Sequence, residues 1–73
     1  MKVRLRLSDP ALADDLLDFL RRRDCPGDRV GEAMIEVRLP HEFDEKAGRA
    51  ELDFYLYIWQ SLHSWSTRIN IVE

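Results

Sequence analysis

The chain has few of the cysteine and histidine residues that stabilise very small domains through disulfides or bound metal ions. Its 73 residues include one cysteine, Cys25, so no disulfide can form within the chain. The two histidines, His41 and His63, are expected at opposite ends of a helix, roughly 30 Å apart, and so could not share a metal ion. We therefore expect no metal or other cofactor. A core of this size is marginal, and oligomerisation is the common remaining source of stability.

Long apolar runs and a large net charge are also absent. No segment approaches the ~20 consecutive apolar residues that cross a bilayer, and charged residues interrupt the N-terminal segment, unlike a signal peptide. The net charge of −3 is too small to attract the whole molecule to nucleic acid or a membrane. With one free cysteine, the expected location is the cytoplasm. A 45% apolar composition with three glycines and three prolines indicates a single globular domain over residues 1–73.

What the chain does contain is an alternation of strand and helix patterns. Residues 2–7 alternate charged and apolar side chains, as in a half-buried strand. Asp9 followed by Pro10 is typical of a helix start, and the helix is expected to continue to Arg23. The apolar stripe of this helix consists of Ala13, Leu16, Leu17 and Leu20.

Two further strands and a last strand follow from the same period-2 pattern. Segments 28–30 and 33–39 flank Gly31-Glu32, which predicts a hairpin with a two-residue type II′ turn. One long strand over 29–39 is the alternative, which Gly31 disfavours. A final strand is expected over 67–72.

With a second helix before the last strand, the element order is β-α-β-β-α-β. Right-handed crossovers then place both helices on one face of a four-stranded antiparallel sheet with strand order 4-1-3-2. This arrangement is the α+β ferredoxin-like plait. The plait carries many unrelated activities, so the fold predicts no function.

The second helix, expected over residues 44–65, is unusual because it has two apolar faces. One stripe is formed by Leu52, Tyr55, Leu56, Trp59 and Leu62, and the other by Phe54, Tyr57, Ile58 and Trp65. A small domain can bury only one of them well. Gly48 lies on the first face, where it would allow close packing on the sheet, whereas Glu51 lies on the second, where burial of an unpaired carboxylate is costly. We therefore assign the first stripe to the core and the second to an interface. The alternative is that the second stripe only covers a shoulder of the sheet.

The open face of the predicted sheet is rich in basic residues. It is expected to present Lys2, Arg4, Arg6, Glu36, Arg38, Arg68 and Asn70. Arginines bind phosphate and carboxylate groups through paired hydrogen bonds, so Arg4, Arg6, Arg38 and Arg68 are a candidate anion site. The face lacks the aromatic residues on which RNA-binding plaits stack bases, so nucleic acid is not an expected partner. The simpler alternative is a solvated face with ordinary Arg–Glu pairs.

Candidates for catalysis are weak. Asp14, Asp15 and Asp18 are expected on the solvent side of the first helix, and His63 is expected to pack beside Trp59 or to contact the carbonyls at the helix end. Cys25 would need a neighbouring histidine to act as a nucleophile, and no nucleophile or phosphate-loop motif is present. An enzyme is therefore not expected.

These observations favour a non-catalytic interaction module. The chain is expected to form a homodimer, or to dock on a protein partner, through the outer apolar face of its second helix. The last strand, which carries little edge protection, could add to this contact. The alternative is an anion-binding or regulatory module that uses the arginine-rich sheet face.

Overall fold

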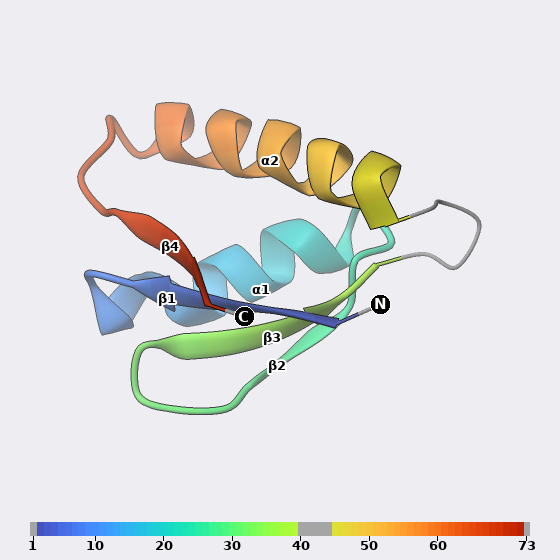
Figure 1. The fold of residues 1–73 in the computed structure, drawn as a ribbon. Coiled ribbons are helices and arrows are strands. Elements are labelled where there is room, and N and C mark those ends of the chain that lie inside the picture. The colour runs from blue at the N-terminus through green and yellow to red at the C-terminus, as the bar shows by residue number, and fades with distance from the viewer. Residues whose placement is uncertain (1, 40–44, 73) are drawn as a thin grey trace.

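The computed structural model describes residues 2–39 and 45–72, and Figure 1 shows their arrangement. In chain order the elements are β1 (Lys2–Leu7), the 3₁₀ turn η1 (Pro10–Leu12), α1 (Ala13–Arg21), β2 (Gly27–Arg29), β3 (Met34–Arg38), α2 (Glu45–Leu62) and β4 (Ile69–Val72). The predicted α+β class, with one four-stranded antiparallel sheet and two helices, is confirmed. The strands are ordered β2-β3-β1-β4, which is 4-1-3-2 when read from the other edge.

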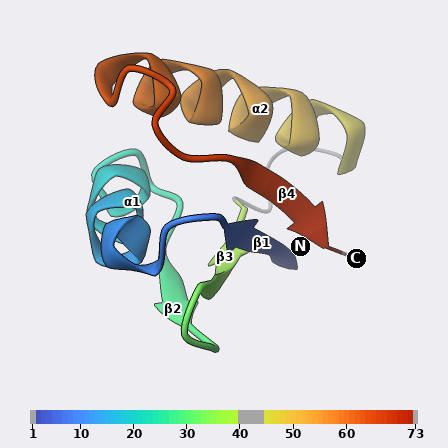
Figure 2. The ribbon, with the colours of Figure 1, turned by 90° about the vertical axis from the view of Figure 1, so that its left-hand side faces the viewer.

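Both helices lie on one face of the sheet (Figure 2). The reason is the alternation along β1, in which every second side chain is buried and the intervening charged ones are exposed. β1 pairs with β3 on one side and β4 on the other, with Leu5 opposite both Ile35 and Ile71. The core therefore sits between this face and the two helices. Among the described residues, no helix is long and apolar enough to cross a membrane.

The first helix begins where the sequence indicates, but its first turn differs. The Asp9 carboxylate accepts the Ala11 N–H at 3.0 Å, and Pro10 follows it as the first residue of a 3₁₀ turn. The α-helix proper runs from Ala13 to Arg21, so it ends two residues before the predicted Arg23. The four residues of the predicted apolar stripe, Ala13, Leu16, Leu17 and Leu20, are all buried.

The hairpin is present, but the predicted type II′ turn is wrong. β2 and β3 pair from Gly27 opposite Val37 to Arg29 opposite Ile35, which also rules out a single strand over 29–39. No described glycine has a positive φ, whereas a type II′ turn needs one at Gly31. Instead, the connection is longer, and Arg29 donates hydrogen bonds to the carbonyls of Gly31 and Glu32. The loop is thus built around a guanidinium group.

The inner face of α2 follows the prediction except at its end. Leu52, Leu56 and Trp59 are buried, and Tyr55 is half-buried. The assignment of Leu62 to the core is wrong, because its side chain is 70% exposed. Leu62 is the last residue of the helix and borders an open pocket instead of the sheet.

The helix also ends earlier than the predicted Trp65. Ser64 and Trp65 have φ values of 55° and 58°, a left-handed conformation that terminates a helix. The Trp65 N–H donates to the Gln60 carbonyl at 2.9 Å, which closes the last turn. The predicted first residue of this helix, Asp44, lies outside the described residues, as does His41.

Candidate functional site

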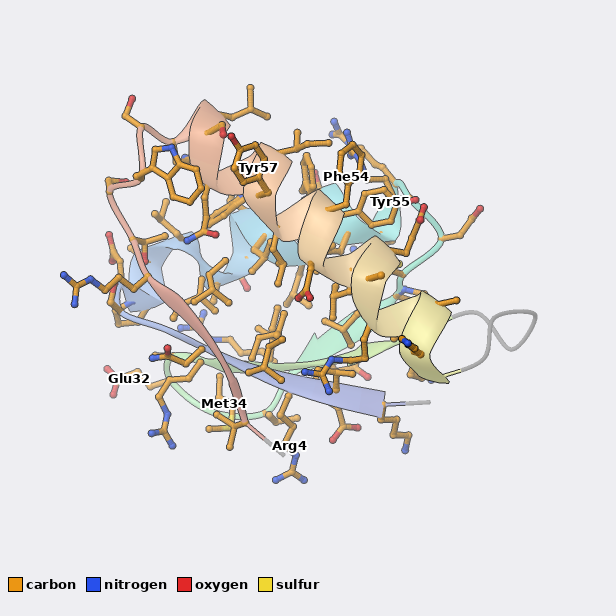
Figure 3. All side chains as sticks on the ribbon, turned by 45° about the horizontal axis from the view of Figure 1, so that its top comes forward. Arg4, Glu32, Met34, Phe54, Tyr55 and Tyr57 are labelled. Carbon is orange, nitrogen blue, oxygen red and sulfur yellow. The ribbon has the colours of Figure 1, made fainter. Side chains whose placement is uncertain are left out.

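Among the described residues, four of the five large apolar side chains that remain exposed lie on α2 and the turn that follows it. Phe54 is 59% exposed, Tyr57 60%, Leu62 70% and Trp65 53%. Figure 3 shows Phe54 and Tyr57 projecting from α2 away from the sheet. Ile58, the remaining residue of the predicted interface, is half-buried. We refer to Phe54, Tyr57, Ile58, Leu62 and Trp65 together as the α2 surface.

The α2 surface has two parts. Phe54, Ile58 and Leu62 follow one another at intervals of four residues, so they form a continuous row along the helix. Tyr57 lies on the other side of Phe54 and contacts Trp65, with ring centroids 5.3 Å apart in an edge-to-face arrangement. The two parts share one outward-facing surface of α2. The prediction did not include Leu62 here, although its four-residue spacing from Ile58 is visible in the sequence.

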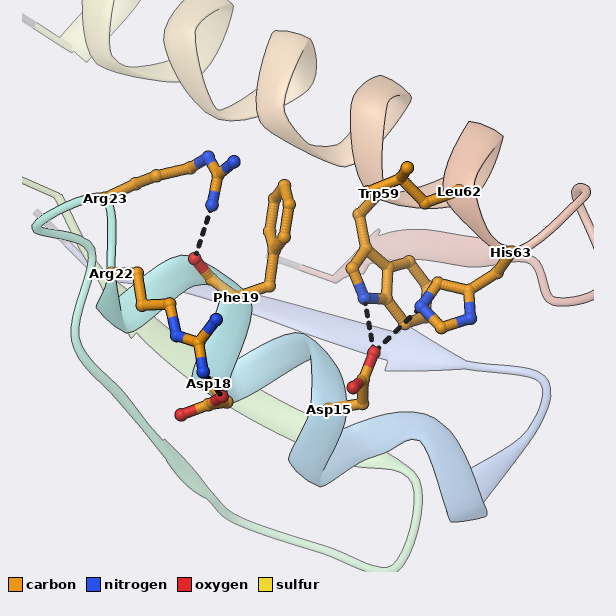
Figure 4. A pocket seen from close by; sticks show the side chains of 8 residues that line it. All are labelled: Asp15, Asp18, Phe19, Arg22, Arg23, Trp59, Leu62 and His63. Atoms are coloured by element: carbon orange, nitrogen blue, oxygen red, sulfur yellow. Dashed lines mark hydrogen bonds and ion pairs between the residues drawn. The ribbon is translucent and has the colours of Figure 1, made fainter.

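A pocket of about 380 Å³ lies where α1 faces the C-terminal half of α2 (Figure 4). Its lining consists of Asp15, Asp18, Phe19, Arg22, Arg23, Trp59, Leu62 and His63. We call it the interhelix pocket. Leu62 belongs both to this pocket and to the α2 surface, so the two features are continuous.

Asp15 organises one side of the interhelix pocket. Its Oδ2 accepts a hydrogen bond from Trp59 Nε1 at 3.0 Å and lies 2.8 Å from His63 Nε2. The rings of Trp59 and His63 are 4.3 Å apart, so the expected packing of His63 beside Trp59 is confirmed. The expectation that Asp15 lies on the solvent side of α1 agrees with its 56% exposed side chain, but the pattern of α1 alone did not reveal its contacts with Trp59 of α2 and with His63 of the turn that follows.

Two arginines form the other side of the interhelix pocket. Arg22 pairs with Asp18 at 3.0 Å. Arg23 donates to the Phe19 carbonyl at 3.1 Å, and its guanidinium carbon lies 3.7 Å from the centre of the Phe19 ring. Each charged or imidazole side chain of the pocket therefore has a partner within the molecule.

The described residues do not combine into a recognisable catalytic group. Asp15 and His63 form a carboxylate–imidazole pair, but the thiol of Cys25 is buried elsewhere in the core. Burial, followed by the charges of Glu51 and Asp24, raises the pKa of that thiol, which keeps it protonated and unreactive. Within residues 2–39 and 45–72, no three or more His, Cys, Asp or Glu side chains are placed to hold a metal ion.

The open face of the sheet is partly neutralised. Glu36 pairs with Arg4 at 3.2 Å and with Lys2 at 3.8 Å. Arg38 pairs with Asp28 at 3.8 Å. Asp28 was not expected on this face, but the strand register places it opposite Glu36.

The four arginines of the candidate anion site differ in whether they form ion pairs. Arg6 and Arg68 form no ion pair with any residue that the structure describes. Arg6 faces Asn70 across the β1–β4 pair, and Arg68 precedes Asn70 by two residues, which makes it a diagonal neighbour of Arg6. Of the predicted set of Arg4, Arg6, Arg38 and Arg68, only Arg6 and Arg68 are therefore without an acidic partner among the described residues.

Comparisons with protein-family models, with curated proteins and with solved structures found no match to this chain.

Proposed function

We propose that this chain is a non-catalytic interaction module that self-associates through the α2 surface. The observation that carries the proposal is the exposure of four large apolar side chains, each more than half exposed, on one helix and its following turn. Contiguous apolar patches of this kind mark association sites, and aromatic residues are enriched at their energetic centres. Full burial of one such side chain contributes about 1.5–3 kcal/mol.

The interhelix pocket supports the same conclusion. Its ionisable groups are all engaged with each other or with Phe19 and Trp59, and the contacts of Asp15 with Trp59 and His63 join α1 to α2 and to the turn after it. A catalytic pocket instead presents poised groups toward a substrate. The combination favours association over chemistry.

The test is the absolute mass of the protein, measured by size-exclusion chromatography with light scattering from micromolar to millimolar concentration. We expect the mass to rise from 8.6 kDa toward twice that value. Phe54→Asp should keep the protein monomeric and folded, because Phe54 is exposed. Leu56→Asp should unfold it, because Leu56 is in the core.

Lys46→Asp is the matched control, since Lys46 is an exposed position of α2 outside the α2 surface. This variant should associate like the wild type. A wild-type mass that stays at 8.6 kDa at millimolar concentration would refute self-association.

We further infer that the fold is the ferredoxin-like plait and that the protein works in the cytoplasm. The chain order of the elements, the strand order and the position of both helices on one face support the first inference. The free thiol of Cys25, held in the core, supports a reducing compartment.

A second candidate function is anion binding on the open sheet face. It is favoured by Arg6 and Arg68, which have no acidic partner among the described residues. Inorganic phosphate at low ionic strength should raise the melting temperature, and Arg6→Gln or Arg68→Gln should abolish the rise. Arg4→Gln is the control, because Arg4 is already paired with Glu36. No rise with phosphate would exclude this function.

A further inference from the structure

The interhelix pocket is suited to an apolar ring. Its charged groups are already paired, so an apolar group can enter without leaving a buried charge unpaired. Phe19 and Leu62 supply accessible apolar surface along its lining, whereas Trp59 is only 1% exposed there. A volume of about 380 Å³ is ample for one aromatic side chain.

The α2 surface carries such a ring at a matching position. Phe54, Ile58 and Leu62 form one row with Ile58 at its centre, four residues from each neighbour. If two copies of α2 pack antiparallel about a two-fold axis at Ile58, residue 54 of each helix lies opposite residue 62 of the other. A two-fold interface must be self-complementary, and this row meets that condition because Leu62 borders the pocket.

We propose that two copies of this chain pack α2 against α2 in this register, and that Phe54 of each copy enters the interhelix pocket of the other. The partner's Phe54 then lies beside Leu62 and Phe19, close to the buried Trp59. This inference rests on the proposed self-association and specifies its geometry.

The proposed contact between the two α2 helices is short, so the dimer should be weak. Residues 54–62 span about 12 Å of helix, so the helix–helix contact itself buries less than the ~800 Å² per partner of a standard interface. The pocket therefore provides the specific anchor, as a buried aromatic side chain does at a hot spot. We expect a dimer that dissociates on dilution.

Site-specific cross-linking tests the register. In a Cys25→Ala background, Ile58→Cys should be joined to its symmetry mate by a short bis-maleimide at concentrations where the protein is dimeric. Asp53→Cys is the control, because this exposed position faces away from the Phe54–Ile58–Leu62 row.

Fluorescence tests the occupant of the pocket. In a Trp65→Phe variant, Trp59 is the only tryptophan, and its emission should change as the protein is diluted. Phe54→Ala should weaken the dimer about 10-fold or more and abolish this change. Tyr57→Ala is the matched control, since Tyr57 is equally exposed but lies outside the row, and it should weaken the dimer much less.

The outcomes separate the two proposals. A monomeric wild type at every concentration would refute both the self-association and this geometry. A dimer in which Ile58→Cys fails to cross-link, or in which Phe54→Ala and Tyr57→Ala have equal effects, would overturn the pocket insertion while leaving self-association intact.

Discussion

At the scale of single residues, Gly27 shows how closely β2 is packed. A Cβ atom at this position would lie 2.6 Å from the Glu36 carbonyl oxygen and 3.0 Å from Leu17 Cδ2. The first of these atoms belongs to the backbone of β3 and cannot move without disturbing the sheet. Glycine is thus required by close approach of the chain and not by an unusual φ.

We expect Gly27→Ala to lower the free energy of unfolding by about 1–3 kcal/mol through overpacking. Gly31→Ala is the control, because its Cβ would meet only Met34 Cβ at an ordinary 3.5 Å, and its effect should stay within about 0.5 kcal/mol. The free energies of unfolding of both variants can be measured by urea unfolding. Equal stability of the two variants would contradict the close packing of β2.

The raised pKa values of two other residues lead us to expect a loss of stability at alkaline pH. Burial raises the pKa of Cys25 above its usual 9.0, with smaller contributions from Glu51 and Asp24. The pKa of Tyr55 is raised first by its hydrogen bond to Glu51, which is 2.6 Å long, and then by desolvation. Each group therefore ionises at lower pH in the unfolded chain than in the folded one.

The unfolded state then binds fewer protons, so the contribution of these two groups to stability should be constant well below pH 9 and fall as the pH rises above it. Urea unfolding between pH 7 and about pH 10.5 would show this decline. Cys25→Ala and Tyr55→Phe should each reduce its slope. An unchanged slope in both variants would assign the alkaline loss to other groups.

At the scale of elements, the connection from α2 to β4 is held by polar contacts. Thr67 is buried, and its Oγ1 lies 2.9 Å from Ser8 Oγ and accepts the Asp9 N–H at 3.2 Å. Ser8 in turn exchanges hydrogen bonds with the backbone of Arg68. The strand β4 covers Ile69–Val72 and is therefore shorter than the predicted 67–72. The hydrogen bond from the Ser8 N–H to the Arg68 carbonyl extends the pairing of β4 with β1.

Thr67→Val keeps the side-chain shape and removes the hydroxyl, which leaves the Asp9 N–H without its acceptor. We expect a loss of about 1–3 kcal/mol in the free energy of unfolding and faster amide exchange in β4. Thr67→Ser retains the hydroxyl and should recover much of the loss. Equal stability of the valine and serine variants would show that the hydroxyl does not hold β4.

At the scale of the whole molecule, the two faces have different character. The helical side carries the exposed α2 surface, and the open sheet face carries basic side chains, among them Arg6 and Arg68. Association through the first depends on apolar burial, which salt does not screen, whereas anion binding at the second is electrostatic.

We therefore expect self-association to persist in about 0.5 M NaCl, and the melting temperature to rise with protein concentration. Any shift caused by phosphate should disappear under the same conditions. Light scattering and thermal melts at low and high salt provide the measurements. Loss of the dimer in salt would mean that charged groups, not the α2 surface, hold the copies together.

Patterns with a local period were predicted best from the sequence. The apolar stripe of α1 and the alternation along β1 are both present, because a helix or strand repeats its own geometry. The turn at Gly31 was not predicted correctly, since the side chain of Arg29 organises that loop. Asp28 was likewise missed on the open face, because the register of β2 against β3 places it there.

The sequence by itself determined the α+β class, the order of helices and strands, and the presence of more apolar surface on the second helix than one core can bury. The tertiary structure decided where each helix is covered. In the folded protein, Leu62 at the end of α2 is exposed, and Asp15 of α1 contacts Trp59 and His63. A pocket remains between α1 and the C-terminal half of α2. Periodicity describes one element at a time, whereas burial depends on which neighbouring element reaches each side chain.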